Sequence, residues 1–336
     1  MAKGENRKLQ ENTDPLVVGA MSTGAVIAAL AAAIGGWIGY SALRINHRAD
    51  LPDAVDAERH TFITANAGMI SYYADRSGKG RPLVLIHSIN AAASAYEMRP
   101  LFLHYRSKRP VYALDLPGFG LSERSKRVYS PRLYTDAIVE LLESQVRGGP
   151  VDVVALSLGS EFAARAAFER PDLIHSLTLI SPSGFSRRSA PRETADRYYK
   201  GFSFPLWSQA FYDLLVAPAS IKYFLKRSFQ GKVDPGLIDY DYRTGHQPGA
   251  RFAPLYFISG KLFSPNIREL VYEKLTQPVL VLYDRDSFVQ FDTLPDVLAK
   301  HSNWQSVRIA PTKGLPHWEK LDETAQALDE FWQANT

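Results

Sequence analysis

The sequence predicts an α/β fold in which a mostly parallel sheet is flanked by helices. Short apolar runs rich in Val, Ile and Leu alternate with stretches of helical periodicity, which is typical of parallel strands buried on both faces. One of these runs ends abruptly at Ser157, where a helical pattern begins. The alternation lapses over residues 185–275 and then returns, which indicates an insertion within one large domain.

The predicted elements follow in a simple order along the chain. Strands are expected at residues 61–66, 69–75, 82–87, 111–116, 151–157, 173–180, 278–284 and 306–310. Helices are expected at residues 131–146, 160–169, 294–300 and 318–332. The predicted organisation is a polar tail at 1–15, a transmembrane anchor at 16–43, a linker at 44–60, a core in two parts at 61–184 and 276–334, and a helical lid at 185–275.

Composition excludes several kinds of site. The chain has no cysteine, so disulfides, thiolate zinc sites and cysteine nucleophiles are ruled out. The eight histidines are scattered and form no metal-binding pair, so we expect neither a metal nor another cofactor.

The predicted lid is basic and aromatic. Residues 183–277 hold 14 Lys and Arg against 8 Asp and Glu, whereas the whole chain has a net charge of only +4. Such a mixture is found in nucleic-acid and anionic-lipid binders, and no nucleic-acid motif accompanies it here. A solvated helical insertion with an aromatic underside explains it equally well, so we expect no nucleic-acid partner. The oligomeric state stays open.

Residues 16–43 form an apolar run without a charged side chain. About 20 apolar residues span the hydrocarbon of a bilayer, so the run predicts a single-pass membrane anchor. Trp37 and Tyr40 near its end, followed by Arg44 and Arg48, fit the aromatic and basic flank of a helix that leaves a membrane. A signal peptide cleaved after residues 31–33 is the alternative.

Basic residues flank the predicted anchor on both sides. Lys3, Arg7 and Lys8 precede the run, and three arginines follow it within reach of the interface, so the basic residues are nearly balanced. We favour an N-terminus on the cytoplasmic side and a main domain outside it.

Ser157 is the candidate nucleophile. It lies in Ala155-Leu-Ser-Leu-Gly159, between a buried strand and a helix, where a sharp turn exposes a serine hydroxyl at the edge of a sheet and points the next amides toward it. The small residues at 155 and 159 permit the tight turn. The alternative is that Ser157 merely caps the helix.

The order of motifs resembles the α/β-hydrolase superfamily over residues 61–332. The resemblance rests on His87-Ser-Ile-Asn90, Asp115-Leu-Pro-Gly-Phe-Gly-Leu-Ser122, the turn at Ser157, Asp286, and Pro316-His-Trp-Glu319. It implies a serine, acid and histidine in that chain order.

The resemblance also assigns roles to particular residues. It implies Ser157 as nucleophile and the amides of Ile89 and Leu158 as an oxyanion hole. For the acid it offers Asp284 and Asp286, of which Asp286 fits the pattern before Phe-Val better. His87 is expected to be structural.

The catalytic base is displaced in this pattern. When Pro316 and Glu319 fix the register, the usual histidine position falls on Gly314, and His317 lies three residues further on. We expect His317 to be the base, which accepts the proton of the serine hydroxyl while a carboxylate orients its ring. The alternatives are that His317 packs the last helix, or that the lid residue His246 supplies the base.

The sequence therefore predicts a membrane-anchored serine hydrolase that cleaves an apolar, small-molecule carboxylic ester through an acyl-Ser157 intermediate. A ligand-binding relative with an incomplete triad is one alternative. A cofactor-free C–C hydrolase or perhydrolase is another, since one fold hosts many chemistries.

Overall fold

The computed structural model describes residues 23–146, 148–187 and 194–336. The expected polar tail, the first seven residues of the expected anchor and residues 188–193 of the expected lid lie outside the described residues.

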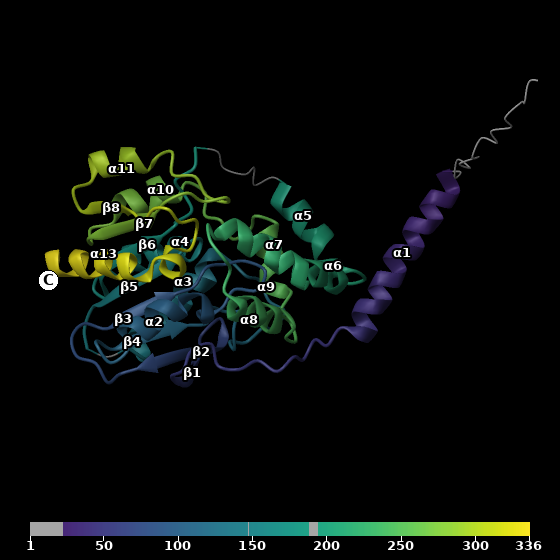
Figure 1. The fold of residues 1–336 in the computed structure, drawn as a ribbon, viewed down its shortest axis with the longest axis horizontal. Coiled ribbons are helices and arrows are strands. Elements are labelled where there is room, and N and C mark those ends of the chain that lie inside the picture. Colours follow the sequence, from purple (N-terminus) through teal and green to yellow (C-terminus); the bar gives the residue numbers. More distant parts are fainter. Residues whose placement is uncertain (1–22, 147, 188–193) are drawn as a thin grey trace, which may run out of the picture.

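An eight-stranded sheet forms the centre of the molecule (Figure 1). The strands are β1 (Glu58–Thr64), β2 (Gly68–Asp75), β3 (Leu83–Ile86), β4 (Val111–Leu114), β5 (Val151–Leu156), β6 (Ile174–Ile180), β7 (Val279–Tyr283) and β8 (Trp304–Arg308). Their order is β1-β2-β4-β3-β5-β6-β7-β8. β2 pairs antiparallel with both neighbours, and all the other pairs are parallel. The predicted fold class is confirmed.

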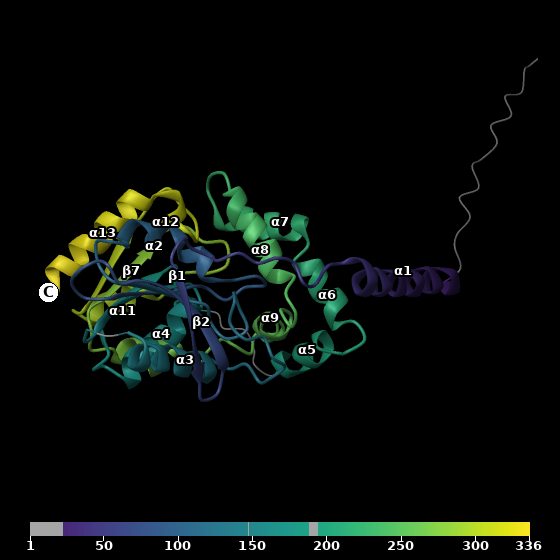
Figure 2. The same ribbon diagram turned by 90° about the horizontal axis from the view of Figure 1, so that it is seen from below.

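Helices cover both faces of the sheet (Figure 2). On one face lie α2 (Arg99–Tyr105) and α13 (Leu321–Ala334), and on the other lie α3 (Pro131–Ser144), α4 (Gly159–Glu169) and α11 (Leu294–Lys300). Each face has its own hydrophobic core, because the central strands bury side chains on both sides. The sheet therefore serves as a rigid platform whose strand ends carry the loops.

Local sequence explains where these helices begin. The Ser130 hydroxyl accepts the Leu133 amide at 3.3 Å and Pro131 occupies the first turn of α3, which is a favourable helix start. The expected helix at 318–332 differs from the structure. It is divided into α12 (Pro316–Glu319) and α13, because Lys320 leaves the helical conformation with φ −143° and ψ 65°.

Most of the segment 185–275 gathers at one end of the sheet as short helices (Figure 1). These are α5 (Ala195–Phe202), α6 (Ser208–Leu215), α7 (Pro218–Ser228), α8 (Pro235–Gly245) and α9 (Phe252–Ile258). The short helix α10 (Ile267–Leu270) and the 3₁₀ turn η3 (Tyr272–Lys274) lie apart from this group, beside β8. Tyr212, Val216, Ile221 and Ala250 form a small separate core with Ala92 of the main domain. We call α5 to α9 the lid.

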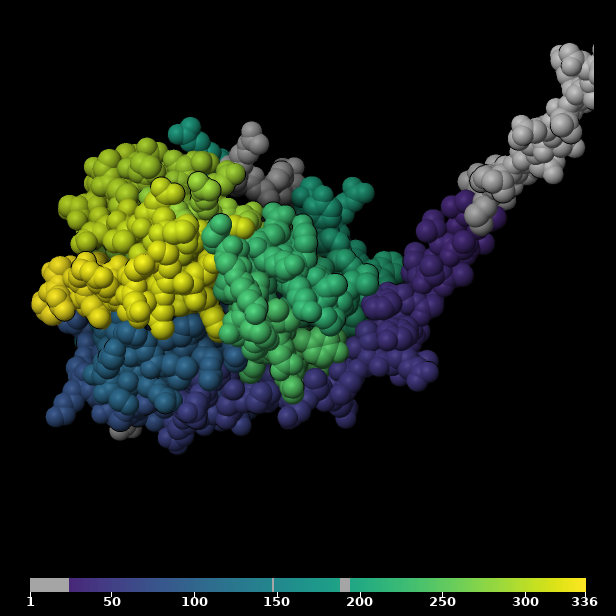
Figure 3. All heavy atoms as spheres, in the orientation of Figure 1, coloured from purple at the N-terminus to yellow at the C-terminus, as the bar shows by residue number. Residues whose placement is uncertain are grey.

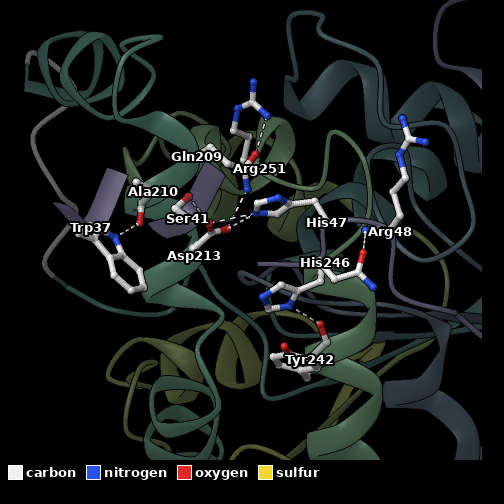
Figure 4. Close-up of polar contacts among 11 residues, drawn as sticks. Trp37, Ser41, His47, Arg48, Gln209, Ala210, Asp213, Tyr242, His246 and Arg251 are labelled. Carbon is white, nitrogen blue, oxygen red and sulfur yellow. Dashed lines mark hydrogen bonds and ion pairs between the residues drawn. The ribbon is translucent and has the colours of Figure 1, made fainter. Parts of the chain in front are cut away.

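The N-terminal helix α1 (Thr23–Arg44) projects from the lid end of the molecule (Figures 1 and 3). Residues Gly24–Arg44 are long and apolar enough to cross a membrane, with a mean hydropathy of 1.8; a signal sequence or the core helix of a soluble protein meets the same criterion. The C-terminal part of α1 contacts the body, where the Trp37 indole donates to the Ala210 carbonyl at 2.8 Å (Figure 4).

Candidate active site

Ser157 lies at a sharp turn between β5 and α4. Its φ of +52° is in the left-handed region, which costs a non-glycine residue about 1–3 kcal/mol. The Ser157 amide donates to the Ile180 carbonyl at 2.8 Å, and the Ser157 carbonyl accepts the Ser160 amide at 3.1 Å. These bonds hold a strained residue at the carboxyl end of a central strand, where a nucleophilic serine would stand.

Gly159 allows the turn to pass close to the neighbouring strand. A Cβ at this position would lie 2.3 Å from the carbonyl oxygen of His87, which follows β3. No side chain fits without moving the backbone. The close approach places the loop after β3 beside Ser157.

Two buried amides at this junction are not engaged. The backbone N–H groups of Ile89 and Leu158 donate no hydrogen bond to another residue in the described ranges, although both residues are at most 3% exposed. Unpaired buried amides are rare in proteins. Ile89 and Leu158 are the two residues whose amides the sequence predicts to form the oxyanion hole.

Glu97 holds the loop that carries the Ile89 amide. The buried carboxylate accepts the Ser88 amide at 2.8 Å, the Ser88 hydroxyl at 2.9 Å and the Asn90 side-chain amide at 2.6 Å. Burial raises the pKa of Glu97 to about 7, although these hydrogen bonds oppose the rise. Sequence reasoning missed Glu97, because a lone glutamate in a turn (η1, Ala95–Met98) carries no motif.

His87 has a structural environment, as expected. Its Nε2 accepts the Leu116 amide at 2.9 Å, and its Nδ1–H donates to the Ser88 carbonyl at 2.5 Å. Burial lowers the pKa of His87 to about 4, so the ring is neutral at physiological pH. The ring thereby fixes the turn after β3.

The two candidate acids have different surroundings. Asp284 binds Arg308 Nε at 2.6 Å and accepts the Thr312 amide at 2.9 Å; these contacts lower its pKa although burial opposes them. Both of its oxygens are therefore occupied.

Asp286 is half-buried, and its Oδ1 accepts the amides of Phe288 at 2.6 Å and Val289 at 3.0 Å. Burial raises its pKa. Its Oδ2 faces Gly314: a Cβ on Gly314 would lie 2.7 Å from that oxygen. Asp286 thus presents one oxygen to the position where the sequence register places a catalytic histidine.

His317 points elsewhere in this structure. Its ring is fully buried, and its Nε2–H donates to the Glu97 carbonyl at 2.9 Å, an acceptor that the Trp318 indole shares at 2.7 Å. Burial lowers the pKa of His317 to about 4. Within the described part of the chain, Nδ1 has no hydrogen-bond partner, and no hydrogen bond joins the His317 ring to Ser157 or Asp286.

The lid histidine is engaged as well. The Nδ1–H of His246 donates to the Tyr242 carbonyl at 2.7 Å, and its ring lies against the Tyr242 ring with centroids 4.1 Å apart. Its ring also stacks on that of His47, with centroids 6.3 Å apart (Figure 4). These contacts place His246 beside the segment that follows α1.

The lid is attached to the loop that contains Gly314. Glu319 Oε1 accepts the amides of Gln230 at 2.7 Å and Gly231 at 2.8 Å, and its Oε2 accepts the Lys313 amide at 3.0 Å. One carboxylate therefore joins the turn between α7 and α8 to the residue just before Gly314.

The fold and this strand-end serine define a protein of the α/β-hydrolase class. A model of the alpha/beta hydrolase family matches residues 83–327, and the chain belongs to this family. Several of its curated relatives are named hydrolases or esterases, and others are named 1-acylglycerol-3-phosphate O-acyltransferases. The family match and the named hydrolases identify the chain as an α/β-hydrolase-type enzyme.

Two relatives illustrate the range of similarity. An uncharacterized hydrolase, YugF, of Bacillus subtilis is 32% identical over 127 residues, which cover 37% of this chain and 45% of that protein. A 2-(acetamidomethylene)succinate hydrolase of Mesorhizobium japonicum is 25% identical over 243 residues, 70% of this chain and 82% of that protein. The first match thus spans less than half of the relative's length.

Solved structures show the same fold. A thermophilic esterase from Thermogutta terrifontis superposes with a TM-score of 0.66 at 20% identity, covering 83% of this chain and all of that one.

Proposed function

We propose that this protein is a membrane-anchored serine hydrolase that cleaves an apolar carboxylic ester through an acyl-Ser157 intermediate. The observation that carries the proposal is the left-handed conformation of Ser157, together with the buried amides of Ile89 and Leu158, which donate no hydrogen bond within the described ranges. Strain of this kind persists where the surrounding structure over-determines it, and it is concentrated at functional sites.

The chemistry follows from this arrangement. The Ser157 hydroxyl oxygen attacks the ester carbonyl carbon, and the Leu158 and Ile89 amides stabilise the negative charge that develops on the carbonyl oxygen. The intermediate expels an alcohol and leaves the acyl group on Ser157, and water then releases it as a carboxylic acid. Asp286 would stabilise the protonated base.

An activity-based probe tests the nucleophile directly. A fluorophosphonate should modify Ser157 in the purified full chain, and Ser157→Ala should abolish both labelling and ester hydrolysis. Labelling at another serine, or none in folded protein incubated with an added neutral base, would exclude Ser157 as the nucleophile.

Membrane anchoring is supported by α1. Its apolar side chains are exposed, as Ile27 (62%) and Leu43 (84%) show, and it extends away from the body (Figure 3). We expect the intact chain, including Met1, in the membrane fraction, and resistance to extraction by high salt or alkaline buffer. A soluble mature form that begins after residue 33 would support the signal-peptide alternative.

We place the main domain outside the cytoplasm. A phosphatase reporter fused after Thr336 would be active only if it is translocated, and a matched reporter that fluoresces only in the cytoplasm would give the opposite signal. Activity of the cytoplasmic reporter would reverse this orientation.

The substrate class is inferred from the lid. Phe204, Leu206 and Trp207 are 46%, 64% and 40% exposed, and they directly precede α6, the lid helix that contacts α1. An apolar substrate would contact such a surface. Activity should therefore rise with acyl-chain length and with added phospholipid vesicles; a preference for short soluble esters would contradict this inference.

One observation favours a second function. Gly314 faces the free oxygen of Asp286, and His317 donates to Glu97, so the described contacts do not complete a triad. A ligand-binding protein of this fold would bind an ester analogue without turning it over. Calorimetric binding combined with no acid release under any condition would identify that function.

A further inference from the structure

The proposed acid and nucleophile are each held by hydrogen bonds, and among the described residues no hydrogen bond joins a base to either of them. Two amides hold Asp286 Oδ1, which leaves Oδ2 directed at Gly314. In a catalytic triad, the carboxylate orients the base and stabilises its charged form. The residue that Asp286 Oδ2 faces is Gly314, which has no side chain.

Nothing in the local geometry requires glycine at 314. Its φ lies outside the left-handed range, so any L-residue can adopt this backbone. The only near contact of an added Cβ is the Asp286 carboxyl group, and the next atom, Ser228 Cβ, is 4.0 Å away. A carboxylate tip can rotate, so the position can accept a side chain.

His317 is not free to fill this position. It donates to the Glu97 carbonyl from a fully buried site, and the Trp318 indole on the same carbonyl fixes the adjacent backbone. Turning the ring toward Asp286 would break the hydrogen bond and would leave a cavity in the interface between α12 and α2.

We propose that Gly314 leaves an open position for a base, and that the site hydrolyses esters efficiently only when a neutral imidazole or amine occupies it. This inference rests on the proposed serine hydrolase. The base has two possible sources, the substrate itself or a small co-reactant, and the chemistry is the same for both.

The proton balance closes for a co-reactant, and for a substrate that carries the base on its acyl part, because the base then stays in the site until the acyl group is released. The neutral nitrogen accepts the Ser157 proton as Oγ attacks the carbonyl carbon, and the cation formed lies beside Asp286. It then donates that proton to the departing alkoxide. In the second half, the nitrogen takes a proton from the attacking water and returns one to Ser157, so the base is regenerated.

Chemical rescue of the wild-type chain is the first test. Hydrolysis of an unactivated apolar ester should rise with added imidazole and then saturate, after subtraction of the rate with Ser157→Ala. General-base catalysis contributes about 10²–10⁴-fold, so a rise of at least tenfold is expected. Asp286→Asn should weaken the imidazole-dependent part. A substrate that carries its own amine should be cleaved without imidazole.

Gly314→His supplies the base within the chain. We expect this variant to hydrolyse the ester without imidazole and to lose its response to imidazole. Gly201→His is the matched control, because a Cβ at Gly201 would meet no atom within 4 Å. It should behave as wild type.

The outcomes separate the inference from the function on which it rests. Efficient hydrolysis by wild type without any added base, unchanged in Gly314→His, overturns the inference and leaves the serine hydrolase intact. No labelling and no hydrolysis in wild type with imidazole and in folded Gly314→His would reject both.

Discussion

The Ser41 hydroxyl at the end of α1 donates a 2.5 Å hydrogen bond to Asp213 Oδ2 on lid helix α6. His47 Nε2 lies 3.0 Å from both carboxylate oxygens, and Gln209 Nε2 donates to Oδ1 at 2.8 Å (Figure 4). The Asp213 side chain is completely buried. One carboxylate therefore binds the N-terminal helix, the segment that follows it and the lid together.

Replacing Asp213 with Ala should release α1 from the lid. The change leaves the Ser41 hydroxyl and the Gln209 amide without their buried acceptor, and unsatisfied groups of this kind cost about 1–3 kcal/mol each. We expect faster hydrogen exchange in α6 and faster proteolysis between Arg44 and Glu58. Asp196→Ala removes an exposed carboxylate from the same lid and should change neither. Equal protection in both variants would show that Asp213 does not hold the helix.

Gly159→Ala should damage the turn at Ser157. The added methyl group would lie 2.3 Å from the His87 carbonyl, a backbone atom that cannot move aside cheaply. Overpacking of this kind costs about 1–3 kcal/mol. Thermal unfolding should begin at a lower temperature, and fluorophosphonate labelling should slow. Gly201→Ala, which adds the same group at an open helical position, should be neutral or slightly stabilising.

The Glu97→Gln variant should gain stability relative to the wild-type protein as pH rises. The pKa of Glu97 is about 7 in the folded protein and about 4.3 when unfolded, so the folded state binds more protons between these values. Its contribution to stability is complete below pH 4.3 and is lost as pH rises through 7. Glutamine does not ionise and escapes this loss.

The measurement is the difference in melting temperature between wild type and Glu97→Gln from pH 5 to pH 8. Taking the difference removes the contributions of His87 and His317, whose lowered pKa values act in the opposite direction. Asp241 is buried near Glu97 and its pKa is also raised, partly by Glu97, so the variant relieves it as well. A difference that does not vary with pH would contradict the assigned shift.

The His317→Gln variant tests whether His317 has a structural role or acts as the catalytic base. Glutamine can place an N–H near the Glu97 carbonyl, so we expect a modest loss of stability and ester hydrolysis within about threefold of wild type, since the loss of a catalytic base costs about 10²–10⁴-fold. A loss of that size in folded protein would restore His317 as the base.

Much of the sheet was accessible from sequence. The runs at 82–87, 111–116 and 278–284 are apolar and β-branched because their strands are buried on both faces, and the structure places β3, β4 and β7 there. The turn at Ser157 was visible because it needs small residues at fixed positions. The preference for Asp286 over Asp284 remains a prediction, and Arg308 on Asp284 is consistent with it.

Other features depend on contacts between distant segments. Helix α2 carries no strong periodic pattern over its seven residues, and sequence did not predict it. Glu97 acts through three donors that only the folded loop brings together. The register showed that His317 was displaced from Gly314, but the direction of its ring is set by the Glu97 carbonyl, 220 positions away.

The three amides held by Glu319 would restrain any outward movement of the lid. The turn at Gln230 and Gly231 cannot swing outward without breaking its bonds to the carboxylate that also holds Lys313, the neighbour of Gly314. Entry of a bulky molecule under the lid would therefore loosen the loop opposite Asp286, and re-closure would tighten it. Entry of a substrate and the position of the loop that faces Asp286 would thus be coupled through the Glu319 side chain.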